Sequence, residues 1–455
     1  MAPIEQEVII VKSVKKWFVL ILALALVLGL LGACNGNSGG GGGGGSTPST
    51  PSSPPTSSGG GGAPATIKIG VPNPFTGGLA PFGLGSPETE QLVETYVNDV
   101  LGGIYIEEFD TNIPIELIFV DTESSDTKAA EQTQQLISNN DISIMIARHT
   151  PGTALPVSAM SENLATPFVS LECPVDPWLA GGPYEWGYHS FWYVESCAEV
   201  HMGMWEAMGY GPGSVVGPIF PDDPDGNAWA PVYREMIQAA GYTYIDPGPT
   251  EMMAADWTNV INQFKQGGVQ IVTGIPITPD MASFCTQAIQ QGFDFEIAST
   301  GRGTLFPAAM ETFPEELIDK FFGEVWWSPY HPWASSLTGM TAKELGDWWE
   351  DEIGDPWSQV IGFKYAGVEI AVDALIRAAS LDPATIRDAI AATDMETMIG
   401  RIKYDPSTRI AETMLVGGSW SHAGNRPDGS PIAQLDIVYN DSYPAVPLTG
   451  ELKRP

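Results

Sequence analysis

The chain has 455 residues, with 20 lysines and arginines against 55 aspartates and glutamates, so its formal net charge is −35. Hydrophobic residues make up 43% of it and aromatic residues 10%, which is enough for packed cores and excludes a chain that is disordered throughout. Nucleic-acid binding depends on basic side chains that neutralise phosphates, so the acidic balance argues against a nucleic-acid partner.

The N-terminus has the features of an export signal. Lysines precede an apolar run at 17–31, which is shorter than the roughly 20 residues that a membrane-spanning helix needs. The run ends in LGAC at 31–34, which resembles a bacterial lipobox. This resemblance implies a lipoprotein signal peptide at 1–34 and lipidation of the Cys34 thiol. An ordinary signal peptide and an uncleaved membrane anchor are the alternatives.

Residues 35–64 are predicted to be a disordered linker. They are mainly Gly, Ser, Thr and Pro without charge, so they cannot bury enough apolar area to offset the entropy cost of ordering. About thirty such residues reach roughly 30 Å. We therefore expect an exported body, anchored to the membrane by its lipid and facing the periplasm or the cell exterior.

From residue 66 the sequence alternates between short apolar runs and amphipathic segments. At Ser86-Pro87-Glu88, for example, Ser suits a helix cap, Pro the first turn and Glu the positive end of the helix dipole. Strands are expected at 66–71, 115–120, 142–147, 167–170, 214–219, 269–273 and 297–299. Helices are expected from 86, at 126–137, near 153–162, and at 229–240, 257–266, 280–291, 342–352 and 358–379, before a β-rich tail from 399.

This alternation indicates an α/β fold in which helices cover both faces of parallel sheets. The chain is too long for one comfortable core, so we expect two lobes. In open α/β sheets, ligands bind beyond the carboxyl ends of the strands, where backbone N–H groups at helix starts face the cleft.

Several segments then resemble, in consistent order, the branched-chain (Leu/Ile/Val) amino acid-binding proteins that serve ABC importers. The similarity covers about 66–440. The segments are GVPNPFTGGLAPFG at 70–83, NDVLGG at 98–103, DTESSD at 121–126, DDPDG at 222–226 and EVWWSPYHP at 324–332.

The resemblance implies the clamshell of type I periplasmic binding proteins, with two Rossmann-like lobes joined by three crossings. We expect lobe 1 at 65–190 and 327–398, and lobe 2 at 191–326 with a tail at 399–455. A small polar solute would bind between the lobes as a hinge closes, and the closed monomer would dock on an ABC permease and its ATPase. No cofactor is implied.

Candidate ligand residues in lobe 1 follow from this resemblance. Phe82 occupies the place of an aromatic that walls the cleft, with core packing as the alternative role. Thr150 matches a Ser or Thr that helps to hold a ligand carboxylate, or is a plain helix cap. His149 is expected in the cleft wall or in an exposed loop. Glu172 stands where the family usually has a small residue, and it would face an ammonium or hydroxyl group, or solvent.

In lobe 2, Asp225 aligns with a family aromatic, and Ile277 ends a segment that often holds a Tyr. Arg302 falls near an acidic position that binds the ligand amine, so it would instead suit a carboxylate by bidentate pairing, unless it is a surface Arg. Trp326 and Trp327 are expected to place only one ring in the cleft, because they alternate along a strand. Trp327 is the predicted contact.

Four cysteines are present, and Cys173–Cys197 is the tentative disulfide, although the residues alone leave the pairing open. No zinc spacing is recognisable. Arg234 occupies the closing Glu position of the calcium-loop-like segment from 223, so no metal is expected. The chain lacks a nucleophile–base motif, which argues against an enzyme. A ligand-sensing module for a membrane kinase or chemoreceptor, and more weakly an exported hydrolase, remain the alternatives.

Overall fold

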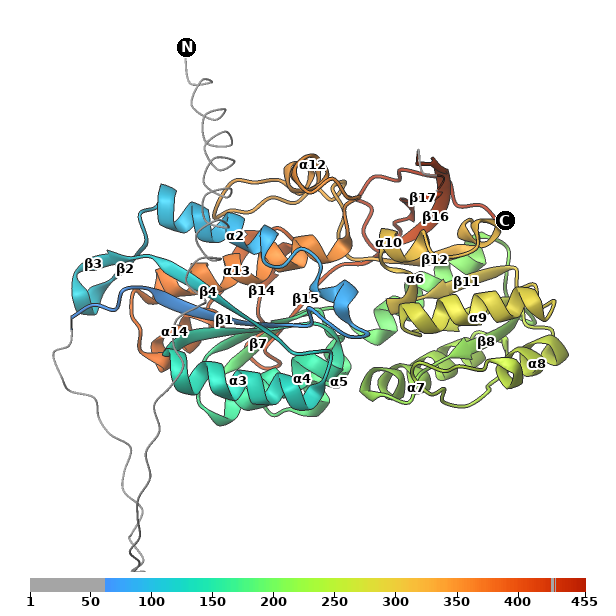
Figure 1. Cartoon of the computed structure of the whole chain (residues 1–455), viewed down its shortest axis with the longest axis horizontal. Coiled ribbons are helices and arrows are strands. Elements are labelled where there is room, and N and C mark those ends of the chain that lie inside the picture. The colour runs from blue at the N-terminus through green and yellow to red at the C-terminus, as the bar shows by residue number, and fades with distance from the viewer. Residues whose placement is uncertain (1–61, 427–428, 430) are drawn as a thin grey trace, which may run out of the picture. The chain divides into compact units, whose positions relative to one another are not determined.

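Two β-sheets, built mainly from parallel strands, organise the protein (Figure 1). The structure is a computed structural model that describes residues 62–426, 429 and 431–455. The predicted signal peptide, Cys34 and nearly all of the predicted linker lie outside the described residues.

The sheet of lobe 1 has the order β4-β1-β5-β6-β7-β15, and all of its strand pairs are parallel. Its strands are β1 (Ile67–Asn73), β4 (Ile115–Asp121), β5 (Ile142–Ala147), β6 (Phe168–Leu171), β7 (Gly187–Phe191) and β15 (Ile410–Glu412). The direction in which successive strands are added reverses between β1 and β5, which creates a crevice at their carboxyl ends.

Helices cover both faces of this sheet, as Figure 1 shows. One face carries α3 (Asp126–Asn140), α4 (Thr150–Asn163) and α5 (Val175–Gly181). The other carries α2 (Glu88–Thr95), α13 (Gln359–Ala378) and α14 (Pro383–Ala391). Smaller elements are η1 (Ala80–Gly83), η2 (Tyr96–Val100), β2 (Ile104–Ile106), η3 (Glu107–Phe109), β3 (Thr111–Ile113), α12 (Ala342–Glu352), β13 (Asp394–Thr397) and β14 (Gly400–Lys403).

The sheet of lobe 2 has the order β9-β8-β10-β11-β12-β16-β17, in which only the last two pairings are antiparallel. Its strands are β8 (Val215–Ile219), β9 (Thr243–Tyr244), β10 (Ile271–Gly274), β11 (Ile297–Thr300), β12 (Phe321–Val325), β16 (Val416–Asn425) and β17 (Pro431–Tyr439). Its helices are α6 (Val194–Ala207), α7 (Pro224–Ala239), α8 (Thr258–Gly267), α9 (Thr278–Gln290), η4 (Arg302–Thr304), α10 (Pro307–Met310) and α11 (Glu315–Ile318). A second crevice lies at the carboxyl ends of β8 and β10.

The chain passes between the sheets after β7, after β12 and after β15, which gives the three expected crossings. The mixed α/β fold of type I periplasmic binding proteins is therefore confirmed. One boundary differs from expectation, because β15 pairs with β7 of lobe 1. The last crossing consequently lies at 413–415, and residues 399–412 do not belong to the tail of lobe 2.

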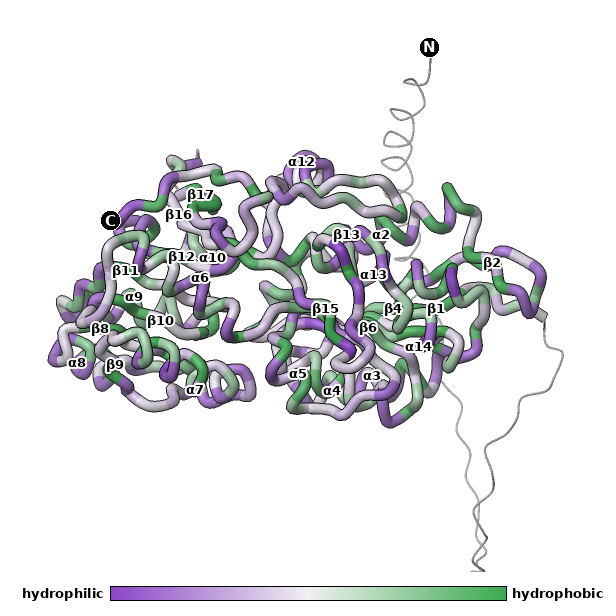
Figure 2. Tube along the Cα trace, turned by 180° about the vertical axis from the view of Figure 1, so that it is seen from behind, coloured by the Kyte–Doolittle hydropathy of each residue, from purple (hydrophilic) through white to green (hydrophobic). Residues whose placement is uncertain are grey.

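The predicted strands and most of the predicted helices match observed elements because the apolar periodicity reports burial directly, whereas β7, β12 and α6 were not predicted. The strands β1, β5 and β11 are almost wholly buried, and Figure 2 shows hydrophilic segments on outer helices such as α12. The prediction that Ser86 caps a helix is wrong, because α2 starts after Pro87. The Ser86 hydroxyl donates to the Glu90 carboxylate instead of accepting a hydrogen bond from the backbone. Among the described helices, none has both the length and the apolar character needed to cross a membrane.

The expected Cys173–Cys197 disulfide is also wrong. Within residues 62–455, the described cysteines Cys173, Cys197 and Cys285 are buried free thiols. Cys173 packs in lobe 1 beside Pro174, whereas Cys197 lies on α6 next to His201 and Tyr233 in lobe 2. Closeness to a crossing in the sequence therefore did not bring the two sulfur atoms together.

Candidate functional site

A small pocket lies where the two crevices face each other. Its residues come from segments at the carboxyl ends of strands in both sheets, as expected for this topology. The interlobe pocket is lined by Phe82, Thr150, Glu172, Pro174, Phe191, Trp192, Asp225, Trp229, Arg302, Leu305, Glu324 and Trp326.

On the lobe 2 side, Arg302 is held between two carboxylates at the start of α7. Its Nη1 donates to Asp223 Oδ2 at 2.9 Å and lies 3.3 Å from Asp225 Oδ2, while its Nε donates to the Ile275 carbonyl at 3.0 Å. The other Asp223 oxygen caps α7 by accepting from the Gly226 N–H. The helix start and the guanidinium therefore fix each other's positions.

Asp225 is the more buried of the two carboxylates. Burial raises its pKa to about 7, although the Arg302 charge acts in the opposite direction. Its Oδ2 faces Arg302, and the Trp229 indole lies close enough to lower its pKa, although neither Asp225 Oδ1 nor Trp229 Nε1 makes a full hydrogen bond among the described residues. This carboxyl group can therefore accept a hydrogen bond from a bound solute.

On the lobe 1 side, Glu172 belongs to a buried network of charges. Lys364 Nζ donates to both of its oxygens, at 2.9 and 3.1 Å, and Arg148 lies 3.9 Å away while donating to Glu90. Burial raises the pKa of Glu172 and lowers that of Lys364 to about 8, and their mutual attraction partly offsets both effects. The network ties β6, α13 and α2 together beneath the pocket.

His149 supports this network and does not line the pocket. It is fully buried, and burial together with the nearby Lys364 and Arg148 charges lowers its pKa well below the ordinary value, so the ring is neutral. Its Nδ1 accepts from Lys364 Nζ at 3.0 Å, and Nε2 bonds to the Asn73 side chain. The expected cleft-wall or exposed-loop position of His149 is therefore wrong.

The backbone around the pocket is strained. His149, Thr150, Glu172 and Arg302 have φ values of 66°, 39°, 55° and 31°, in the left-handed region that favours glycine. Such conformations cost of order 1–3 kcal/mol each and concentrate at ligand-binding sites. Their location at the pocket supports a binding role for this region.

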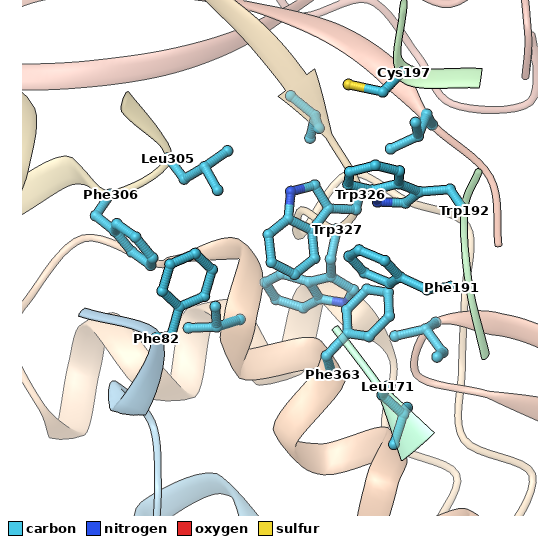
Figure 3. Close-up of a cluster of buried hydrophobic side chains, with 14 of the residues drawn as sticks. Phe82, Leu171, Phe191, Trp192, Cys197, Leu305, Phe306, Trp326, Trp327 and Phe363 are labelled. Atoms are coloured by element: carbon cyan, nitrogen blue, oxygen red, sulfur yellow. The ribbon is translucent and has the colours of Figure 1, made fainter. Parts of the chain in front are cut away.

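Five aromatic rings, those of Phe82, Phe191, Trp192, Trp229 and Trp326, form part of the wall. Figure 3 shows Phe82, Phe191, Trp192 and Trp326 among neighbouring buried apolar side chains. Phe82 from η1 of lobe 1 meets Phe306 of lobe 2 edge to face, with ring centroids 5.0 Å apart. Trp192, in the first crossing, meets Trp229 of α7 in the same way at 5.5 Å. The lobes are thus in contact around the pocket, which is in its closed form.

The pocket is shut so tightly that it has room for about one water molecule, so the lobes must stand further apart to hold a larger solute. Polar atoms in its wall nevertheless have no hydrogen-bond partner among the described residues. They are Trp192 Nε1, Trp229 Nε1, Trp326 Nε1, Arg302 Nη2 and Asp225 Oδ1. Each such buried group costs about 1–3 kcal/mol, so the pocket suits a solute that accepts several hydrogen bonds and donates at least one.

The predicted ligand residues divide clearly. Those that line the pocket are Phe82, Thr150, Glu172, Asp225 and Arg302. Ile277 is buried before α9 and outside the lining. The prediction that Trp327 contacts the ligand is also wrong, because this ring packs against Gly362 and Trp357. Its neighbour Trp326 faces the pocket instead, as the expected alternation along a strand requires.

Sequence reasoning missed several residues that the fold brings to the site. Phe191, Trp192, Trp229 and Leu305 carried no recognisable motif. Lys364 did carry a signal, because it interrupts the otherwise uncharged stretch at 359–368 that begins α13, and it proves to be fully buried. Such a charge in an apolar run is seldom buried unless it is paired.

Two α/β lobes with a shared, aromatic-lined pocket at facing strand ends define a two-lobed solute receptor. Residues 66–424 match the family of periplasmic binding proteins. The chain belongs to that family.

Relatives and solved structures agree with this assignment. The chain is 22% identical over 391 residues to Leu/Ile/Val-binding protein homolog 7 of Brucella abortus, covering 82% of this chain and 95% of that protein. The structure is similar to the leucine-binding protein LivK from Thermotoga maritima, with TM-score 0.69, 18% identity and coverage of 83% and 99%. It is also similar to an ABC-transporter solute-binding protein from R. palustris in complex with 4-hydroxybenzoate, with TM-score 0.65, 15% identity and coverage of 83% and 98%.

Asp225 predicts a pH dependence of stability. Its pKa is raised on folding, from about 3.8 to about 7, so the folded state holds a proton that the unfolded chain has already lost between these values. The stabilisation that the protonated Asp225 gives to the folded state is fully present below the unfolded pKa and is lost as the pH rises to about 7. The free energy of unfolding of Asp225→Asn should therefore rise, relative to that of the wild type, by up to about 4 kcal/mol as the pH goes from 4 to 8.

Urea unfolding of both proteins across this pH range measures the effect. Asp347→Asn, which removes an exposed carboxylate on α12, is the matched control and should show no such trend. A difference between Asp225→Asn and the wild type that stays constant with pH would contradict the assignment.

Proposed function

We propose that this protein is the extracytoplasmic substrate-binding lipoprotein of an ABC importer. It binds a small polar solute between its lobes and closes around it, and the closed form docks on the permease. The observation that carries the proposal is the pocket wall, in which residues from both lobes leave buried hydrogen-bonding groups without partners. The names of the Leu/Ile/Val-binding and hydroxybenzoate-binding relatives are consistent with this role.

The chemistry of the wall favours an amino-acid-like compound, an amide or a small organic acid. Indole N–H groups and Arg302 Nη2 need acceptors such as carboxylate or carbonyl oxygens, and Asp225 Oδ1 needs a donor. The faces and edges of Phe82, Phe191 and Trp229 suit a flat or apolar body. A solute of this type supplies partners for the wall groups at both ends, with the lobes further apart than in this structure, where the pocket has room for only about one water molecule.

Closure follows from the same groups. When the lobes close without a solute, the orphaned donors and acceptors lose water and gain nothing in exchange. A solute that fills these positions removes that penalty in the closed state only. It therefore shifts the equilibrium toward closure, as differential binding to one of two states requires.

Solute binding is tested by thermal unfolding with a panel of amino acids, amides and small organic acids, including hydroxybenzoates. A solute at a hundredfold excess over its Kd should stabilise the protein by about 2.7 kcal/mol and raise its Tm. Trp326→Phe keeps a ring but loses the N–H, so the affinity should fall about tenfold.

Trp257→Phe is the matched control. Trp257 is also a buried indole whose Nε1 lacks a partner in the described residues, but it packs against Phe284 away from the pocket. The affinity of the Trp257→Phe variant for the solute should equal that of the wild type. If no compound of these classes raises the Tm, or if both Trp variants weaken binding equally, the assignment of the pocket is wrong.

The proposed anchor is tested separately. Cys34→Ser removes the thiol that would receive the lipid, so the protein should lose metabolically incorporated fatty acid and leave the membrane fraction. Cys285→Ser, at a buried thiol of α9, should keep both properties. Unchanged fractionation of the Cys34 variant would point instead to an uncleaved N-terminal anchor.

A further inference from the structure

A second cluster of polar side chains lies in the core of lobe 2, behind the wall of the interlobe pocket. Cys197 and His201 stand four residues apart on α6, and Glu324 comes from β12. His201 Nε2 lies 3.9 Å from Cys197 Sγ and 3.1 Å from Glu324 Oε2, and the three ligand atoms all lie within 4.8 Å of one another. The Cys197 and His201 side chains are inaccessible to solvent, and Glu324 is 2% exposed.

The separations between the candidate ligand atoms can be compared with those in a known type of metal site. In a tetrahedral zinc site, with bonds of about 2.3 Å to sulfur and about 2.0–2.1 Å to nitrogen and oxygen, neighbouring ligand atoms are about 3.3–3.6 Å apart. The observed separations of 3.9 and 3.1 Å differ from these by less than about half an ångström. The third pair, Cys197 Sγ and the Glu324 carboxylate, lies within 4.8 Å and must shorten by up to about 1.2 Å, so one of these side chains must rotate for all three atoms to reach one ion.

The surroundings of His201 also match a metal ligand. Its Nδ1 bonds to the Tyr233 hydroxyl at 3.0 Å, which fixes the ring and leaves Nε2 directed toward the other two groups. A histidine that ligates a metal almost always has such a partner on its second ring nitrogen. Tyr233 of α7 is fully buried and thus acts as a positioning residue.

Charge and access point the same way. A thiolate and a carboxylate together neutralise a divalent ion, which removes the cost of burying Glu324 as a charge. Binding replaces the Cys197 S–H bond by a sulfur–metal bond and releases that proton to solvent. Glu324 also lines the interlobe pocket, so an ion can reach the cluster from the cleft when the lobes open.

We propose that Cys197, His201 and Glu324 bind one divalent ion of the zinc type. Thiolate and imidazole ligands select zinc and similar transition metals over magnesium and calcium. The fourth position is open to water or to a group of the solute, because the protein supplies three ligands. The binding of an ion here does not depend on the identity of the solute.

Cobalt titration tests the site directly. The full-length protein is stripped with a chelator and titrated with Co²⁺, whose spectrum reports thiolate ligation. About one equivalent should bind, with the absorption of a four-coordinate cobalt–thiolate centre, and Zn²⁺ should displace it and raise the Tm. Cys197→Ser should abolish the thiolate band, and Tyr233→Phe should weaken binding about tenfold.

Cys285→Ser is the control, because it removes a buried free thiol elsewhere, and it should keep the band. A wild-type protein without a thiolate band, or a band that survives Cys197→Ser, would overturn the proposal. The cluster would then be a metal-free hydrogen-bonded chain of Tyr233, His201 and Glu324. The wild-type titration decides the matter even if a variant fails to fold.

Discussion

The closed pocket depends on the Arg302 guanidinium, which Asp223 and Asp225 hold at the start of α7. This arrangement fixes a charged donor in the wall while leaving its Nη2, and Oδ1 of Asp225, without partners in the described residues. The pocket wall thus keeps hydrogen-bonding groups that the protein's own residues do not satisfy. A receptor needs this property, because groups that the protein already satisfied would gain nothing from a solute.

The fold explains why these groups meet. Each sheet reverses its strand order once, and the reversal opens a crevice at the strand ends. The three crossings place the two crevices opposite each other, so segments far apart in the sequence contribute to one pocket. Lobe 1 adds rigidity through the buried network of Glu172, Lys364, Arg148 and Glu90, which lies directly beneath the pocket.

Much of this organisation could be predicted from the sequence, because buried strands such as β1 and β5 are mainly apolar runs. Phe82, Thr150, Glu172, Asp225 and Arg302 were found because each follows a strand in a segment that resembles a known family.

Other features depend on packing between distant segments, which no local pattern reports. Which of Trp326 and Trp327 faces the pocket is set by Gly362 of α13, whose missing side chain makes room for Trp327. His149 looked like a loop residue, yet Lys364 and Asn73 hold it in the core. Cys197 looked like half of a disulfide because its real neighbours, His201 and Glu324, become visible only when α6 packs on β12.

Closure of the two lobes around a solute is the central claim, and a distance measurement between spin labels tests it most directly. Labels at Gln135 on α3 and Glu235 on α7, both exposed, report on one lobe each, since the described cysteines are buried. With the solute identified by thermal unfolding, the distribution should be broad without it and should shift to a single shorter distance at saturation. An identical distribution with and without saturating solute would contradict the account.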